Sequence, residues 1–184
     1  SEDEVLLLWQ GLGYYSRARN MHSAAKQIVG MGGFPKDYSD VRKLSGVGEY
    51  TAAAICSICY GRPCAVLDGN VFRVLSRYLG IDTPIDSSQG KKVFRQMADE
   101  MLDVQNPAVY NQAIMDFGAM ICTPKSPQCT DCPLADTCSA FADGLTAELP
   151  IKSRKVKIRN RFLTYLILTD AQGRVYIRKR GKGD

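Results

Sequence analysis

The stretch CTPKSPQCTDCPLADTC, residues 122–138, constrains the fold of this chain more than any other stretch. It closes a helical region with four cysteines in the spacing C-x6-C-x2-C-x5-C, namely Cys122, Cys129, Cys132 and Cys138. Four thiolates in so short a loop can surround one metal centre. Structural zinc usually shows two C-x2-C pairs, whereas this loop has one. Disulfides are typical of secreted chains, and no part of this sequence resembles a signal peptide. The loop therefore predicts a single metal centre.

The composition is that of a globular protein. Hydrophobic residues make up 45% and charged residues 23% of the chain, which excludes a disordered polypeptide. The net charge of 24 − 19 = +5 permits nucleic-acid binding, although solubility alone would also explain it. No apolar stretch has membrane length. We expect no membrane partner and an intracellular location: cytoplasm or nucleoid if bacterial, nucleus or mitochondrion if eukaryotic.

The region before the cysteine loop has the pattern of an all-α fold. Ser1–Glu4 forms a capping box, and the helix that it starts ends at the turn Gly11-Leu12-Gly13. A buried helical face is indicated by Val71, Val74, Leu75, Tyr78 and Leu79. Further helices are predicted over 14–31, 38–44, 49–60 and 88–103. Asn106 and Pro107 are predicted to cap and start a last helix, which ends near 121. The remaining cysteines, Cys56, Cys59 and Cys64, are interpreted as small buried hydrophobic residues.

The segment Leu44-Ser45-Gly46-Val47-Gly48 lies at the corner between two of these helices. Glycine allows a tight turn and a close approach of another surface. The helix that follows directs its free N–H groups, and its positive dipole end, at this corner. A DNA phosphate fits such a site, and contacts of that kind position a duplex without reading its sequence. We predict that Gly46, Val47 and Gly48 contact DNA, with an ordinary helix–turn–helix corner as the alternative.

Together with these features, three stretches resemble the adenine DNA glycosylases of the endonuclease III, helix–hairpin–helix superfamily. They are GLGYYSRARN at 11–20, LDGNV at 67–71 and NQAIMDFGAMIC at 111–122. The resemblance implies an all-α, two-lobed DNA glycosylase core over 1–121, a helix–hairpin–helix at about 41–60, and a 4Fe–4S cluster loop at 122–138. Zinc remains the alternative metal. The implied activity is hydrolytic removal of adenine mispaired with 8-oxoguanine or guanine in double-stranded DNA, by a monomer.

The resemblance assigns catalytic roles to Asp68, Asn70 and Tyr50. Asp68 matches the aspartate that faces the sugar, where a fixed carboxylate stabilises oxocarbenium charge at C1′. Its ordinary role would be an N-terminal helix cap, and the two roles are compatible. Bifunctional relatives carry a lysine nucleophile at the position of Tyr50. Tyr50 cannot form a Schiff base, which disfavours the alternative of an endonuclease III-like glycosylase/lyase for oxidised pyrimidines.

Tyr14 matches, by the same resemblance, a tyrosine that inserts beside the oxidised guanine. Base extrusion leaves a gap that an aromatic ring can fill, and stacking is worth roughly 1–3 kcal/mol per base. A position in the core is the alternative for Tyr14. Arg17, Arg19 and Lys125 are predicted phosphate contacts, with solvated surface charge as the alternative.

The pattern changes after Cys138. Residues 139–158 are polar and basic, and we expect an interdomain linker. Residues 162–168 and 175–180, joined by Asp170-Ala171-Gln172-Gly173, predict a β-hairpin. The resemblance implies that 159–184 is the truncated start of a Nudix-like domain that recognises the oxidised guanine.

The chain begins with Ser1 rather than Met, and we expect a fragment. Adenine glycosylases place a general-acid glutamate upstream of the segment that matches Ser1, and no residue here corresponds to it. We therefore expect DNA binding with impaired excision. A catalytically silent iron–sulfur DNA-binding module is the alternative from another functional class.

Overall fold

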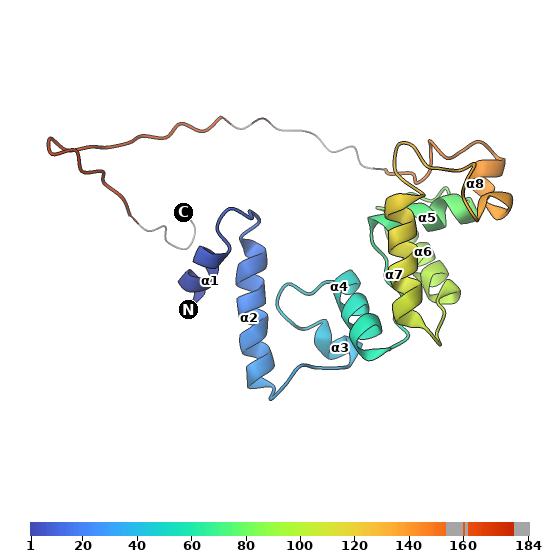
Figure 1. Ribbon diagram of the computed structural model, residues 1–184, viewed down its shortest axis with the longest axis horizontal. Helices are drawn as coiled ribbons and strands as arrows, with labels where there is room; N and C mark the ends of the chain where they lie inside the picture. Colours follow the sequence, from blue (N-terminus) through green and yellow to red (C-terminus); the bar gives the residue numbers. More distant parts are fainter. Residues whose placement is uncertain (154–159, 161, 179–184) are drawn as a thin grey trace. The chain divides into compact units, whose positions relative to one another are not determined.

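A computed structural model describes residues 1–153, 160 and 162–178 of the chain (Figure 1). The chain divides into two units, Ser1–Arg154 and Lys155–Asp184. Within the described residues all helices belong to the first unit, there are no strands, and no helix is long and apolar enough to cross a membrane. The elements are α1 (Glu2–Leu8), α2 (Ser16–Gly30), α3 (Tyr38–Val41), α4 (Glu49–Ala54), the π-helical turn η1 (Ile55–Cys59), α5 (Gly69–Leu79), α6 (Ser88–Met101), α7 (Pro107–Met120), the 3-10 turn η2 (Ala135–Thr137) and α8 (Ser139–Ala142).

The ends of the predicted helices follow their capping residues. Ser1 and Glu4 form the expected capping box at the start of α1, and the hydroxyl of Ser87 accepts the Gly90 N–H at 2.8 Å to begin α6. Asn106 precedes Pro107 at the start of α7, but it makes no side-chain cap. Its amide donates to Asp103 at 3.0 Å instead, so the predicted capping role of Asn106 is wrong.

The predicted helix over 49–60 is present as two joined pieces. The helix α4 continues into the wider turn η1, where the Ser57 hydroxyl donates to the Ala53 carbonyl at 2.8 Å. A hydroxyl bonded four residues back competes with the helical pattern and bends helices. Cys56 is fully buried here, whereas Cys64 is half-buried and Cys59 is exposed. The prediction of buried cysteines therefore fails at Cys59, which lies on the outer side of the turn.

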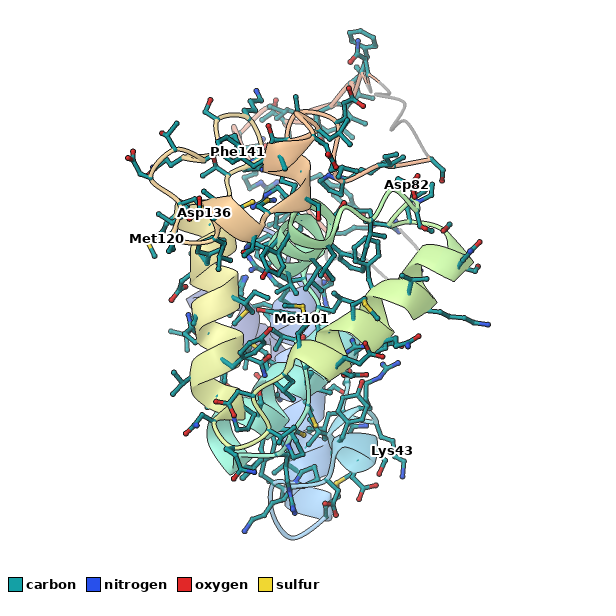
Figure 2. All side chains as sticks on the ribbon, turned by 90° about the vertical axis from the view of Figure 1, so that its right-hand side faces the viewer. Lys43, Asp82, Met101, Met120, Asp136 and Phe141 are labelled. Carbon is teal, nitrogen blue, oxygen red and sulfur yellow. The ribbon has the colours of Figure 1, made fainter. Side chains whose placement is uncertain are left out.

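The core of the first unit is built around α5. This helix packs against α6, α7 and α8, which surround it in Figure 1. Leu75 and Phe94 are fully buried, and the ring of Phe94 meets that of Phe72 edge-on at 5.2 Å. Met120, at the end of α7, and Phe141, on α8, lie at one end of the unit (Figure 2). The core thus carries the residue that precedes α5, Asp68, and the end of α7, where the cysteine loop begins.

The first part of the predicted linker is folded into the helical unit. Ala140 and Leu149 are buried, and the Ile85 N–H donates to the Ile151 carbonyl at 3.0 Å. The backbone N–H and hydroxyl of Ser153 both donate to Asp86, at 2.8 and 2.9 Å. Two buried apolar residues and these backbone hydrogen bonds dock the segment, although its average composition is polar. The rest of the predicted linker, 154–158, lies outside the described residues.

The second unit contains the predicted turn but not the predicted strands. One antiparallel bridge joins Thr169 to Val175, and the carboxylate of Asp170 accepts the N–H of Arg174 at 2.9 Å. Phe162, at the start of the first predicted strand, is 94% exposed. An isolated two-stranded hairpin is marginally stable at best, which explains why pairing stops after one bridge. Residues 179 and 180 of the second predicted strand lie outside the described residues.

Candidate functional site

The glycine corner between α3 and α4 packs against α2. Gly46 has φ +75°, and a Cβ there would lie 2.6 Å from Cβ of Asn20. The backbone N–H of Ser45 donates to the side-chain oxygen of Gln27 at 2.7 Å. Gly46 is therefore required by the fold of the corner itself.

Gly48 serves a different purpose in the same corner. Its φ is −87°, and a Cβ there would meet no atom of the chain within 4 Å. Gly48 is exposed and precedes α4 without any side-chain cap. The N–H groups of the first turn thus have no side-chain acceptor and face an open surface, which suits the approach of an external phosphate.

Asp68 is the N-terminal cap of α5, and both of its carboxylate oxygens are occupied. One oxygen accepts the backbone N–H groups of Asn70 at 2.9 Å and Val71 at 2.8 Å. The other accepts the Asn70 side-chain amide at 3.0 Å. The half-buried carboxylate is held in one orientation by these three donors. A fixed negative charge of this kind can stabilise a developing cation without reorganising.

Arg73 continues the hydrogen-bond chain from Asn70 to the cysteine loop. One of its terminal amino groups donates to the Asn70 side-chain oxygen at 2.9 Å and to the Gly118 carbonyl at 2.6 Å. Its Nε donates to the Cys122 carbonyl at 2.6 Å. Burial lowers the pKa of Arg73 from its ordinary value. A continuous path of hydrogen bonds therefore connects the carboxylate of Asp68 with the first cysteine.

The close packing of α5 against α7 keeps this path in place. Gly118 faces Asn70, and a Cβ at Gly118 would lie 2.7 Å from the Cβ of Asn70. No side chain larger than hydrogen fits there without displacing the residue that holds Asp68.

Tyr50 lies on α4, next to the hairpin. It is 41% exposed, and its hydroxyl donates to the sulfur of Met115 on α7 at 3.5 Å. The phenol is thus tied to α7, the helix that also packs against the start of α5. Tyr50 carries no amine, so this position offers no Schiff-base chemistry.

The four cysteines of the loop line one cavity. Its wall also includes apolar side chains of α5, α7 and α8, among them Val74, Phe117 and Phe141. Within the described part of the chain, no set of His, Cys, Asp and Glu side chains is gathered closely enough for a single metal ion. A four-iron cluster is a larger body than one ion and holds its thiolates further apart, so four cysteines spread around a shared cavity fit the cluster.

Arg77 anchors the cysteine loop to α5. Its guanidinium, in a residue only 2% exposed, donates to the carbonyls of Leu149 at 2.9 Å, Thr123 at 2.7 Å and Pro124 at 3.1 Å. It also lies 3.5 Å from the sulfur of Cys122. Burial raises the pKa of the Cys129 thiol, and the negative charge of the other three cysteines raises it further, whereas Arg77 opposes the shift. Binding iron as thiolates would relieve this repulsion.

The predicted DNA contacts are spread over the surface. Tyr14 is 81% exposed, so a position in the core is wrong for it, and Arg17 lies beside its ring. Arg19 pairs with Glu2 at 3.3 Å, and Lys125 is exposed on the cysteine loop. No hydrogen bond or ring contact within the described residues joins Tyr14 to the Asp68 site.

Three supporting residues were missed by the sequence analysis: Arg73, Arg77 and Asn111. Asn111 is buried, and its amide holds the segment before Asp68: it accepts the Val66 N–H at 3.1 Å and donates to the Cys64 carbonyl at 2.8 Å. The signal for the arginines was their spacing of four residues within a helix whose other residues are mostly apolar, because charged residues there need buried partners.

Comparison with known proteins agrees with this geometry. Residues 1–100 match the family model described as HhH-GPD superfamily base excision DNA repair protein, and residues 122–138 match the iron–sulfur binding domain of endonuclease III. The match over 122–138 confirms the prediction of an iron–sulfur cluster as cofactor.

Individual relatives are of the same kind. Adenine DNA glycosylase from Homo sapiens is 41% identical over 76% of this chain and 26% of its own length. Adenine DNA glycosylase from Buchnera aphidicola subsp. Schizaphis graminum is 36% identical over 96% of this chain and 51% of its own length. The chain thus spans about half the length, or less, of these relatives. A solved non-covalent endonuclease III–DNA complex has a TM-score of 0.66 and 26% identity, covering 79% of this chain and 67% of the other.

Proposed function

This chain belongs to the HhH-GPD superfamily of base excision DNA repair proteins, and on that premise we propose that it acts as a monofunctional adenine DNA glycosylase. The substrate is adenine mispaired with 8-oxoguanine or guanine in double-stranded DNA. The observation that carries the proposal is the carboxylate of Asp68, held by three donors at the start of α5.

The proposed reaction is hydrolysis of the bond between C1′ of the deoxyribose and the adenine nitrogen. As that bond breaks, the electron pair leaves with the base and positive charge develops on the sugar. Asp68 stabilises this charge, and Asn70 holds the carboxylate in place from the side chain and the backbone. Water then adds to C1′ and its proton leaves, while adenine takes up a proton. The tyrosine at position 50 supports direct hydrolysis over a covalent lyase route.

Duplex binding is assigned to the exposed residues of the first unit. Gly46, Val47 and Gly48 present the open turn before α4 to a phosphate, and Tyr14 is the proposed aromatic wedge. Arg17, Arg19 and Lys125 are proposed to add phosphate contacts. Residues 159–184 are proposed to begin a Nudix-like reader of the oxidised guanine.

The cysteine loop supports the site without taking part in the reaction. When bound, the iron–sulfur cluster supplies a rigid cross-link among four thiolates. Arg77 and Arg73 bond α5 to this loop, so a loop that is held rigid also holds the start of α5, where Asp68 lies. The exposed Lys125 is then placed on an ordered loop.

The charge on Asp68 can be tested without relying on complete turnover. The chain should bind a duplex with a cationic pyrrolidine in place of the target nucleoside, opposite 8-oxoguanine, about tenfold more tightly than a neutral tetrahydrofuran analogue. Asp68→Asn should remove that difference. Asp82→Asn removes a more exposed carboxylate elsewhere and should leave the difference intact.

Two further measurements separate the competing functions. Borohydride should trap no covalent adduct with an adenine-containing or a thymine-glycol duplex, because position 50 has no amine. A strong adduct, or excision of thymine glycol in preference to adenine, would favour the endonuclease III-like alternative. Equal binding of the cationic and neutral analogues by the unaltered chain would favour a silent DNA-binding module.

A further inference from the structure

In the turn between α1 and α2, the Arg17 side chain lies beside two aromatic rings, those of Trp9 and Tyr14. The guanidinium carbon of Arg17 lies 5.6 Å from the ring centroid of Trp9 and 5.4 Å from that of Tyr14. Both separations are within the range of cation–π attraction. The indole N–H of Trp9 also donates to the Gly13 carbonyl at 3.0 Å, which closes the turn.

The backbone of this turn directs Tyr14 outward. Tyr14 has φ +46° and is the one non-glycine residue with positive φ among those the structure describes. It follows Gly13, whose φ is +65°, and its carbonyl accepts the Arg17 N–H at 2.9 Å. A tyrosine in this conformation is strained and persists only where its surroundings hold it. Those surroundings are the Trp9 hydrogen bond and the cation beside the ring.

The charge of Arg17 is available for a ligand. Arg17 forms no ion pair with any carboxylate in the described part of the chain, whereas Arg19 in the same helix is paired with Glu2. Arg17 therefore contacts two aromatic faces and keeps the hydrogen-bonding edge of its guanidinium free of acidic partners. An exposed aromatic ring with a cation at its face suits a nucleic acid, in which stacked bases alternate with phosphates.

We propose that Trp9 and Arg17 are positioning residues that hold the ring of Tyr14 ready to stack in a distorted duplex. Arg17 reaches the phosphate next to the inserted ring as the ring enters. The inference rests on the proposed function, since it requires that the protein bind duplex DNA at a base-pair defect. It gives roles in that function to two further residues. Trp9 supports the turn that presents Tyr14, and Arg17 links the ring of Tyr14 to a DNA phosphate.

The test compares two duplexes and uses the complete 184-residue chain. One duplex carries a tetrahydrofuran abasic site opposite 8-oxoguanine, and the other is fully matched. The ratio of the two dissociation constants measures the binding gained only at the defect, where the ring of Tyr14 inserts, because phosphate contacts made without insertion contribute equally to both duplexes. Tyr14→Leu should abolish the preference for the defect, and Arg17→Gln should reduce it roughly fivefold. In the Tyr14→Leu background, Arg17→Gln should lower the ratio no further.

Matched variants separate positioning from simple loss of charge or of folding. Lys26→Gln removes one positive charge from an exposed site on α2 and should leave the ratio unchanged. Trp9→Phe keeps an aromatic support without the N–H and should retain more of the ratio than Trp9→Leu. Because Trp9 is the single tryptophan of the chain, its emission reports on this turn alone. Arg17→Gln should alter that emission in the free protein, and Lys26→Gln should not.

The outcomes are distinguishable. If Tyr14→Leu removes the preference but Arg17→Gln behaves like Lys26→Gln, or if the effects of Tyr14→Leu and Arg17→Gln add in full, this inference is overturned and the proposed function stands. If the unaltered chain binds the defect no better than the matched duplex, both are overturned.

Discussion

Helix α5 and the turn before α2 place their polar side chains in opposite surroundings. Around α5, Arg73 and Arg77 are 8% and 2% exposed, and their donors are bonded to carbonyls of segments far along the chain. In the turn, Tyr14 is 81% exposed and is held by neighbours within a few residues. The difference indicates that the proposed chemistry depends on the whole helical unit, whereas the proposed wedge depends on one local turn. Damage near α5 should therefore affect folding and chemistry together, and damage in the turn should affect only DNA contacts.

The largest expected effect is at the cysteine loop. Cys132→Ser should prevent cluster assembly, so that iron falls from about four atoms per chain to a small fraction of that value. Loss of the cross-link should lower both the melting temperature and the affinity for duplex DNA, because the loop is bonded to α5. Iron and sulfide analysis of anaerobically purified protein, with thermal unfolding, measures this. Cys59→Ser is the matched control, since Cys59 is exposed and far from the loop in sequence. Stoichiometric zinc in the unaltered protein, without iron or sulfide, would contradict the expectation.

The next effect tests whether α5 depends on its buried cation. Arg77→Met keeps the length of the side chain but leaves the Leu149, Thr123 and Pro124 carbonyls without their donor. We expect a loss of about 3 kcal/mol, which for a chain of this size lowers the melting temperature by roughly 10 °C. Lys92→Met on the exposed side of α6 should cost little. Equal melting temperatures for the two variants would show that the anchoring by Arg77 is unimportant.

The two glycines of the hairpin also differ in their surroundings: Gly46 packs against Asn20, whereas Gly48 faces open space. Gly46→Ala introduces a Cβ against Asn20 at positive φ and should destabilise the protein by about 1–3 kcal/mol. Gly48→Ala meets open space, so stability should change by less than about 0.5 kcal/mol, while affinity for duplex DNA falls. Chemical denaturation and duplex titration of the two variants measure the contrast. A Gly48→Ala protein with unchanged DNA affinity would argue against a phosphate at the hairpin.

The smallest effect is expected on the exposed α1–α2 surface. Glu2→Gln breaks the pair with Arg19, in which both side chains are about half exposed, and should change stability by less than about 0.5 kcal/mol. The freed Arg19 should increase DNA affinity slightly at low salt, with the gain disappearing as salt rises. Duplex titrations at several salt concentrations test this, and a stability loss above 1 kcal/mol would show that the pair supports the fold.

Much of the helical unit was predictable because its signals are local. Ser1 and Glu4, Asp68 and the apolar face of 71–79 each act within one or two helical turns, and they are present as predicted except at the end of α5, where Tyr78 is half-buried and Leu79 is exposed. Asp68 and Asn70 also proved to lie side by side, since they are two residues apart at a helix start. The all-α prediction is confirmed for the described residues.

What could not be predicted depends on contacts between distant segments. The partners of Arg77 lie 45 to 72 residues away along the chain, and no local pattern specifies them. The same reason applies to the folded part of the expected linker, where Leu149 is buried and its carbonyl accepts from Arg77, 72 residues earlier. The predicted hairpin failed although its local pattern is sound, because a hairpin of two strands depends on packing that its own sequence does not supply.

The bond between Arg77 and the Leu149 carbonyl also sets an order for folding during synthesis. The two residues are 72 positions apart, so α5 leaves the ribosome well before the acceptor that completes its burial. At roughly 5–20 residues per second, the apolar face of α5 and its two arginines wait several seconds for their partners. During that interval the nascent chain exposes an apolar helix face. Such a face makes it a substrate for chaperones and proteases until the last part of the helical unit has emerged.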